Sequence, residues 1–185
     1  MTLTIDALMA RGPVIPVIVI DDIAAARPLA ERLVAAGMTV LEVTMRTPAA
    51  LDAMRAMADV PGAVVGAGTV LNEVQLDAAL AAGAQFIVSP GLTDRLGHAV
   101  AERGVPFLPG IATAGDIMRG LDLGLDRFKF FPAVASGGLA ALSALAAPFH
   151  QVRFCPTGGI TAATAPDWLA HPSVACVGGS WMVKG

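Results

Sequence analysis

The sequence predicts an α/β protein of the (β/α)8 TIM barrel class, in which parallel strands and helices alternate along the chain. Short apolar runs rich in Val, Ile and Phe alternate with alanine-rich stretches of helical character, which is typical of a parallel sheet. The runs begin every 20 to 26 residues, and eight of them favour a closed barrel over an open doubly wound sheet, which stays as the alternative. The expected strands are Val14 to Ile20, Val40 to Met45, Ala63 to Thr69, Phe86 to Ser89, Phe107 to Ile111, Arg127 to Phe131, Val152 to Pro156 and Val174 to Gly178.

Helical stretches lie between these strands, and several of them are followed by a glycine. Gly37, Gly83, Gly104 and Gly124 hold this position, which favours glycine because the residue that ends a helix commonly has a positive φ. No linker or low-complexity segment interrupts the alternation, so residues 1–185 are expected to form a single barrel domain. The expected helices include Ile23 to Ala36, Ala49 to Val60, Glu73 to Ala82 and Gly138 to Ala146.

The chain is short for this fold, which typically takes about 250 residues. The sequence stops four residues after Trp181, so the eighth helix of the barrel is expected to be missing from the given chain. Three alternatives stay open: the ordered chain ends early, or the wall that this helix would otherwise close is covered by the segment before the first strand or by a neighbouring subunit.

Composition excludes several classes of function. The chain is 55% hydrophobic with a mean hydropathy of +0.68, but Pro, Gly and Ser interrupt its longest uncharged stretch, residues 130–152, so no membrane span is expected. The first eleven residues lack the basic start and long apolar middle of a secretion signal, which favours a cytoplasmic protein. A net charge of −3 without basic clusters argues against nucleic acid as a partner. Cys155 and Cys176 lie in apolar runs and are expected to be reduced and buried.

Lys129 is the residue that indicates the type of reaction most strongly, because the chain holds only two lysines but ten arginines. It lies within the aromatic run Phe128 to Pro132, which predicts a buried strand, where an unpaired ammonium is costly. Arginine stays protonated at any accessible pH, whereas a lysine removed from water can lose its proton and attack a carbonyl carbon. The residue type therefore indicates imine chemistry, and the alternative is a lysine that only snorkels or forms an ion pair.

Polar side chains alternate along the end of the second expected strand. Glu42, Thr44 and Arg46 share one face, while the residues between them are apolar, so the polar face is expected to point into the barrel. This is the carboxyl end of the strand, where barrel enzymes place their catalytic groups. A carboxylate and a guanidinium inside a barrel need a partner or a ligand, and the alternative is a purely structural ion pair between Glu42 and Arg46.

Glycines gather after other strand ends. Gly66 and Gly68 precede Thr69 and allow a ligand close to the backbone, although packing of a small-residue strand explains them equally well. The pairs Gly158–Gly159 and Gly178–Gly179 follow the last two strands, where barrels commonly bind phosphate through backbone N–H groups. The histidines His98, His150 and His171 have no ligand spacing, so no metal site is expected.

Seven blocks occur in order along nearly the whole chain: Pro13 to Ile18, Leu41 to Thr47, Val65 to Leu71, Ser89 to Thr93, Phe128 to Pro132, Arg153 to Ile160 and Gly178 to Trp181. In these blocks the sequence resembles the 2-keto-3-deoxy-6-phosphogluconate and 4-hydroxy-2-oxoglutarate aldolases, which are Schiff-base pyruvate lyases. The missing carboxyl-terminal helix is the one departure, and it removes none of the matched residues.

The resemblance implies a metal-independent class I aldolase of the Entner–Doudoroff pathway, without a cofactor and with a homotrimeric assembly. It implies that Lys129 forms the imine and that Glu42 relays protons. The pyruvyl carboxylate would be held by Arg46, Thr69 and Pro90. The phosphate would be held by Thr157, Gly158, Gly159, Gly179 and Ser180. The implied reaction cleaves 2-keto-3-deoxy-6-phosphogluconate, a keto-acid sugar phosphate, to pyruvate and glyceraldehyde 3-phosphate.

Several other functions remain open. Within the same class, 4-hydroxy-2-oxoglutarate or 2-keto-3-deoxy-6-phosphogalactonate is an alternative substrate. A phosphate-binding barrel epimerase or isomerase would use the same glycine loops without an imine, and would survive Lys129→Arg. A metal-dependent aldolase would be silenced by a chelator, and a phosphosugar-binding protein would bind its ligand without turnover.

Overall fold

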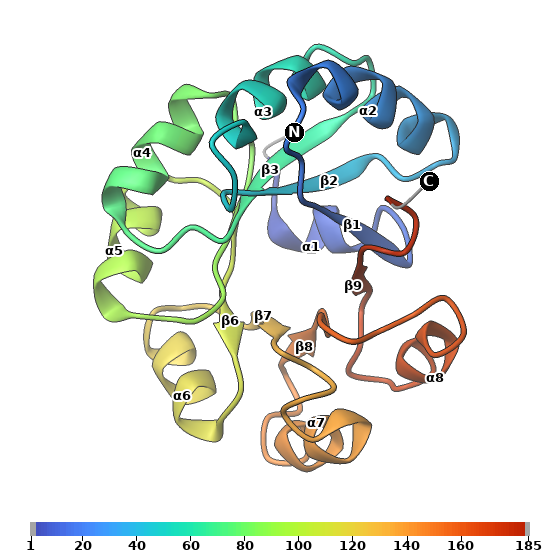
Figure 1. The fold of residues 1–185 in the computed structure, drawn as a ribbon. Helices are drawn as coiled ribbons and strands as arrows, with labels where there is room; N and C mark the ends of the chain where they lie inside the picture. Colours follow the sequence, from blue (N-terminus) through green and yellow to red (C-terminus); the bar gives the residue numbers. More distant parts are fainter. Residues whose placement is uncertain (1–2, 184–185) are drawn as a thin grey trace.

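Parallel strands form the centre of the structure, a computed structural model that describes residues 3–183, and helices form a ring around them (Figure 1). β1, β2, β3, β4, β5 and β9 belong to one sheet in the order β5-β4-β3-β2-β1-β9, and a second sheet has the order β6-β7-β8. The strands are β1 (Val14–Ile18), β2 (Val40–Thr44), β3 (Val64–Gly68), β4 (Ile87–Val88), β5 (Phe107–Leu108), β6 (Gly110–Ile111), β7 (Arg127–Phe130), β8 (Arg153–Phe154) and β9 (Val177–Gly179).

Two junctions join the sheets into a barrel. Pro109 alone separates β5, which pairs with β4, from β6, which pairs with β7, so β5 and β6 are one interrupted strand. A proline has no N–H to donate to a neighbouring strand, which fits the interruption. On the other side, parallel bridges from Phe154 to Val174 and from Thr157 to Gly178 connect β8 to the segment that includes β9. The prediction of eight parallel strands is therefore confirmed, with β5 and β6 together making the fifth.

Helices follow the strands as predicted, and none within residues 3–183 is long and apolar enough to cross a membrane. The expected helix from Ile23 to Ala36 begins instead with the 3-10 turn η1 (Ile23–Ala25), where the Asp22 side chain accepts a hydrogen bond from the Ala24 N–H. The four glycines predicted to end helices all have positive φ. The outer helices are α2 (Ala26–Ala35), α3 (Ala50–Ala58), α4 (Glu73–Ala81), α5 (Asp94–Glu102), α6 (Ala114–Asp122), α7 (Gly138–Ala146) and α8 (Ala165–Leu169).

The segment before the first strand forms α1 (Ile5–Met9), which lies across the middle of the barrel in Figure 1 rather than in the outer ring. Leu8 and Met9 are fully buried and pack against interior residues of the strands. The expectation that this segment replaces the eighth outer helix is therefore wrong, because α1 closes the amino end of the barrel. After β9 the described chain continues only to Val183, and no helix follows β9 within it.

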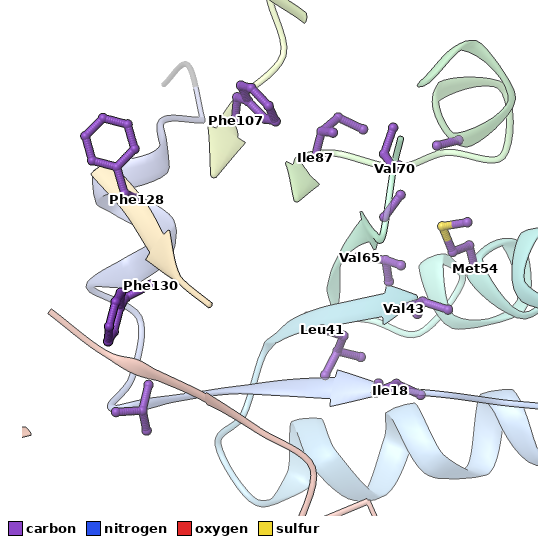
Figure 2. Packing of buried hydrophobic residues seen from close by; sticks show 14 of the residues in the cluster. Ile18, Leu41, Val43, Met54, Val65, Val70, Ile87, Phe107, Phe128 and Phe130 are labelled. Atoms are coloured by element: carbon purple, nitrogen blue, oxygen red, sulfur yellow. The ribbon is translucent and has the colours of Figure 1, made fainter. Parts of the chain in front are cut away.

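The main apolar core lies between the strands and the outer helices. Alternate strand residues contribute to it, and Figure 2 shows Leu41 and Val43 of β2 together with Phe128 and Phe130 of β7. All four side chains are completely buried. Because side chains alternate along a strand, the residues between them, Glu42 and Lys129, must face the inside of the barrel.

A second apolar cluster, here called the inner cluster, fills the amino-terminal half of the barrel interior. Several of its residues lie two positions before a residue of the candidate site, for example Val40 before Glu42 and Cys155 before Thr157. The inner cluster is thus one layer below the site and supports it from beneath. Its members are Leu8, Met9, Ile15, Val40, Val64, Phe86, Val88, Leu108, Cys155 and Cys176.

Candidate active site

Lys129 and Glu42 form an ion pair inside the barrel. Lys129 Nζ donates to Glu42 Oε1 at 2.8 Å and to Oε2 at 3.2 Å, across the interior from β7 to β2. Lys129 is 4% exposed and Glu42 is 2% exposed, so water contributes little to either charge. Each charge therefore depends on the other, because an unpaired buried charge is strongly unfavourable. The alternative ion pair between Glu42 and Arg46 does not form.

Gly68 of β3 makes room for the Glu42 carboxylate. A β-carbon at this position would lie 2.3 Å from Glu42 Oε1 and 2.7 Å from its Cγ, which is closer than nonbonded atoms approach. β2 and β3 pair with Thr44 opposite Gly68, so the glycine adjoins the end of β2. The small residue predicted to admit a ligand thus admits a protein side chain.

An open hollow with about 540 Å³ of empty space lies above Lys129 at the carboxyl ends of the strands. The predicted residues Arg46, Lys129, Thr157, Gly158, Gly159, Gly179 and Ser180 all line it. Four apolar residues that were not among the predicted site residues also line it: Val17, Val19, Phe131 and Ile160. The alternation that placed Lys129 inside the barrel would have placed Phe131 there as well, since the two are two residues apart. Val19 lies within the expected strand Val14 to Ile20, two residues after Val17, so alternation would have placed it there too. Ile160 follows its strand and had no such signal.

Arg46 and Thr69 are brought together by their side chains. Arg46 Nε donates to Thr69 Oγ1 at 3.1 Å, and within residues 3–183 no carboxylate lies within 4.0 Å of the guanidinium. Thr69 has φ of 59°, in the left-handed region that a β-branched residue rarely adopts. Backbone strain of this kind is common at functional sites, where the surrounding structure holds the residue in place. Thr69 itself does not line the hollow, but it orients a residue that does.

The loop after β8 carries Gly158 and Gly159, both with positive φ, of 103° and 78°. Two successive residues of this kind turn the backbone sharply and expose N–H groups, as in many anion-binding loops. A β-carbon on Gly159 would lie 2.7 Å from Val134 Cβ, so the loop also packs tightly against the segment after β7. At the end of β9, a β-carbon on Gly178 would lie 2.2 Å from Thr157 Oγ1, and one on Gly179 would overlap the Trp181 ring.

Pro90 is the predicted site residue that lies elsewhere. It lines a separate hollow with Leu71, Leu92 and Asp116. Its link to the site is through the backbone, because a β-carbon on Gly110 would lie 2.1 Å from the Pro90 carbonyl oxygen. Gly110 pairs directly with Lys129, so the Pro90 carbonyl is one strand away from the amine.

The rest of the described chain offers no comparable concentration of reactive groups. A hollow of about 580 Å³ at the amino end of the barrel is lined mainly by apolar residues, with Arg11 as its one charged residue. Cys155 and Cys176 are free and buried, as expected. No group of three or more His, Cys, Asp or Glu side chains within residues 3–183 could hold a metal ion.

The barrel and its site together define a class of enzyme. An amine beside a carboxylate, under a hollow that offers a guanidinium and glycine loops, is suited to imine formation with an anionic carbonyl compound.

Comparison with known proteins identifies the family. Residues 5–185 match the sequence model of the KDPG and KHG aldolases, and the chain belongs to this family of lyases. The 2-dehydro-3-deoxy-phosphogluconate aldolase of Zymomonas mobilis is 63% identical over 180 residues, which are 97% of this chain and 86% of that protein. The KHG/KDPG aldolase of Escherichia coli K12 is 56% identical over 179 residues, 96% of this chain and 84% of that protein.

Solved structures agree with this assignment. A crystal structure of the 2-keto-3-deoxy-6-phosphogluconate aldolase of Zymomonas mobilis has a TM-score of 0.97 at 61% identity, and the match covers 99% of this chain and 89% of that one. A KDPG aldolase from Legionella pneumophila, solved with pyruvate as a covalent carbinolamine intermediate, has a TM-score of 0.93 at 48% identity. That match covers 97% of this chain and 87% of the other.

Proposed function

We propose that this protein cleaves 2-keto-3-deoxy-6-phosphogluconate to pyruvate and glyceraldehyde 3-phosphate through an imine on Lys129. The observation that carries the proposal is the buried contact of 2.8 Å between Glu42 Oε1 and Nζ of Lys129, which lines the hollow, whereas Glu42 lies behind it. The Legionella relative, which holds pyruvate covalently, supports the same chemistry.

Imine formation begins with a proton transfer inside the ion pair. Glu42 accepts a proton from the Lys129 ammonium, and the neutral amine attacks the C2 ketone of the substrate to give a carbinolamine. Loss of water from the carbinolamine gives the protonated imine, with Glu42 returning its proton to the departing oxygen. The two groups are already within hydrogen-bond distance, so the transfer needs no rearrangement.

Cleavage uses the same two residues. Glu42 removes the proton of the C4 hydroxyl, the bond between C3 and C4 breaks, and its electrons move to the imine nitrogen. The products at this stage are glyceraldehyde 3-phosphate and an enamine on Lys129. Protonation of the enamine carbon and hydrolysis of the imine then release pyruvate and restore the amine.

The two ends of the substrate match the charges of the hollow. We assign the substrate carboxylate to Arg46, which Thr69 orients and which has no carboxylate partner within the described residues. The phosphate is assigned to the backbone around Gly158, Gly159, Gly179 and Ser180, with Thr157 beside it. Pro90 is assigned to the carboxylate end by its place beside the strand next to Lys129. It can only shape that end, because proline has no N–H and its carbonyl oxygen only accepts hydrogen bonds.

Borohydride trapping with pyruvate tests the proposal. Reduction should add the mass of a pyruvate-derived group to the peptide that contains Lys129 and abolish pyruvate release from the phosphorylated substrate. Lys129→Arg keeps a positive charge but cannot form an imine, so we expect it to show neither adduct nor activity. An active enzyme with an unmodified Lys129 peptide would contradict the imine.

A second substrate, 4-hydroxy-2-oxoglutarate, is favoured by the Escherichia coli relative, whose name includes KHG. This compound has no phosphate and should not depend on the glycine loops. Replacement of the exposed Ser180 by Ala is expected to lower kcat/KM for the phosphorylated substrate by about 10- to 100-fold, as for one lost hydrogen bond to a charged group. Activity on 4-hydroxy-2-oxoglutarate should stay unchanged, and an equal loss for both substrates would place Ser180 outside the phosphate site.

We also propose that the protein assembles as a homotrimer. The proposal is supported by two adjoining hollows beyond the ends of β3 and β4, whose lining mixes apolar residues with charged ones such as Glu73 and Arg95. Leu71 and Val74 are large, exposed apolar residues at this surface, as expected of a contact between subunits. Light scattering should give three times the chain mass, and Val74→Glu should lower it.

The proposed location is the cytoplasm. Two free thiols at neighbouring positions of the barrel interior fit a reducing compartment, where disulfides are rare. Cell fractionation with an antibody against the protein would test this location.

A further inference from the structure

Phe131 has a position that the mechanism above does not use. It follows β7, faces the hollow, and its ring centroid lies 5.4 Å from Lys129 Nζ. This distance is within the range at which the face of an aromatic ring attracts a cation. The attraction is stronger when the cation is removed from water, as Lys129 is at 4% exposure.

The neighbouring residues Phe128 and Phe130 differ from Phe131 in the face of the strand that they occupy. Phe128 and Phe130 are completely buried in the main apolar core, and Figure 2 shows both rings on the same side of β7. Phe131 is the member of this aromatic run that shares the barrel interior with Lys129. The Gly158 loop supports the ring from another side, since a β-carbon on Gly158 would lie 3.4 Å from the ring carbons Cδ2 and Cε2.

We propose that Phe131 stabilises the positive charge of the imine nitrogen and so favours the iminium over the neutral carbinolamine. The proposal rests on the proposed function, because it concerns the covalent adduct at Lys129. It assigns to Phe131 an electrostatic part in the reaction, beyond its apolar surface.

The step concerned is the loss of water from the carbinolamine. The lone pair of Lys129 nitrogen forms the second bond to C2 as the bond between C2 and the hydroxyl oxygen breaks, and that oxygen takes the proton held by Glu42. A neutral adduct beside a neutral carboxylic acid thus becomes a cation beside a carboxylate. Any group that favours the cation shifts this step forward.

Glu42 alone stabilises the positive charge on the Lys129 nitrogen less well in the iminium than in the resting enzyme. The ammonium donates to both Glu42 oxygens, at 2.8 and 3.2 Å, whereas the iminium has one N–H left to donate. The face of the Phe131 ring needs no N–H, so its attraction for the nitrogen persists after two protons have left with water. The ring therefore provides a growing share of the stabilisation as the adduct forms.

Fluorination of Phe131 separates the charge of its ring face from its shape. Phenylalanine with one, two or three ring fluorines would be incorporated at position 131, because each fluorine weakens the negative face and changes the size only slightly. The measured quantity is the rate of inactivation by borohydride at saturating pyruvate. We expect a stepwise fall to about one tenth at three fluorines, which corresponds to about 1.4 kcal/mol.

The matched control carries the same fluorines at Phe130, which faces the helices and lies away from the amine. Its inactivation rate should stay within about twofold of the parent at every step. Phe131→Tyr, which keeps a ring face, should also remain close to the parent, whereas Phe131→Leu should fall about tenfold, in line with the loss of a desolvated cation–π contact.

Two results would overturn the proposal in different ways. If the inactivation rate does not change with fluorination but falls in the Phe131→Leu variant, only the shape of the ring matters. Absence of any trapped adduct in the parent would overturn the proposed function itself, and this inference with it. A flat series beside normal trapping in the parent leaves the proposed function intact.

Discussion

Gly68 shows how one missing side chain can position a reactive group. The Glu42 carboxylate occupies the space in which any other residue at position 68 would place its β-carbon. Glu42 is held there by the ammonium of Lys129, so the carboxylate depends on both a charge and a gap. Reactive groups must be held close to their productive geometry, because small displacements lower the rate steeply.

Gly68→Ala is therefore expected to lower kcat/KM by about 100-fold, the effect of a displacement of about 1 Å. Borohydride trapping would fall in parallel, since the displaced carboxylate no longer exchanges a proton with Lys129. Gly12→Ala is the matched control, because a β-carbon there would meet nothing within 4 Å. Normal kinetics in a folded Gly68→Ala protein would refute the role of this gap.

Helix α6 combines a well-formed start with two glycines in very different surroundings. Thr113 and Asp116 form a capping box, in which the Asp116 carboxylate accepts hydrogen bonds from the Ala112 and Thr113 N–H groups. Burial by itself raises the pKa of Asp116, but these hydrogen bonds outweigh it and hold the pKa below its usual range. Gly115 is open to solvent on its free side, whereas Gly120 lies against the ring of Phe128.

The two glycines predict opposite effects of the same substitution. Gly115→Ala should raise the free energy of unfolding by about 0.4–1 kcal/mol, because alanine loses less backbone entropy and its β-carbon makes only an ordinary contact at 3.8 Å. Gly120→Ala should lower it by about 1–3 kcal/mol, since the β-carbon would lie 2.3 Å from a carbon of Phe128. Urea unfolding of both variants measures the difference, and a common sign would contradict the packing described for α6.

The barrel interior has two layers of contrasting chemistry. The upper layer carries the Lys129–Glu42 pair and opens to the hollow, whereas the inner cluster below it is apolar and sealed by α1. Cys155 and Cys176 belong to the lower layer and are at most 2% exposed. The neighbouring Cys155 thiol, together with burial, raises the pKa of Cys176 well above its usual range.

This environment predicts a loss of stability at alkaline pH. Above about pH 8.5 the unfolded chain ionises its Cys176 thiol while the folded chain keeps its proton, so the unfolded state binds fewer protons and stability falls as the pH rises. The fall is up to about 1.4 kcal/mol per pH unit for one thiol. Unfolding of the Cys176→Ala variant between pH 8 and 10 should show a shallower decline than the parent. An identical decline would mean that the folded protein ionises this thiol as readily as the unfolded one.

Much of this architecture could be predicted because it follows from patterns among residues that are close in the sequence. The eight strands follow from apolar runs and their spacing, and the inward position of Glu42 follows from alternation along β2. What could not be predicted depends on contacts between distant segments. The partner of Glu42 is Lys129 rather than the nearby Arg46, and the role of Gly68 depends on the pairing of β3 with β2. The place of α1 across the barrel likewise has no local signal, since an amphipathic segment fits either position.

The Lys129–Glu42 pair also joins parts of the barrel that have different ladders. Glu42 belongs to the six-stranded sheet and Lys129 to the three-stranded one, so the ion pair links the two sheets across the interior. Replacement of Lys129 by the neutral residue Met would remove this link. Deuterium uptake should then quicken in β6, β7 and β8, whose ladders are short, while the five-residue strands β1 to β3 keep their protection. The nitrogen proposed to bind the substrate thus also links the two sheets, and the proposed imine would break and re-form this link in each catalytic cycle.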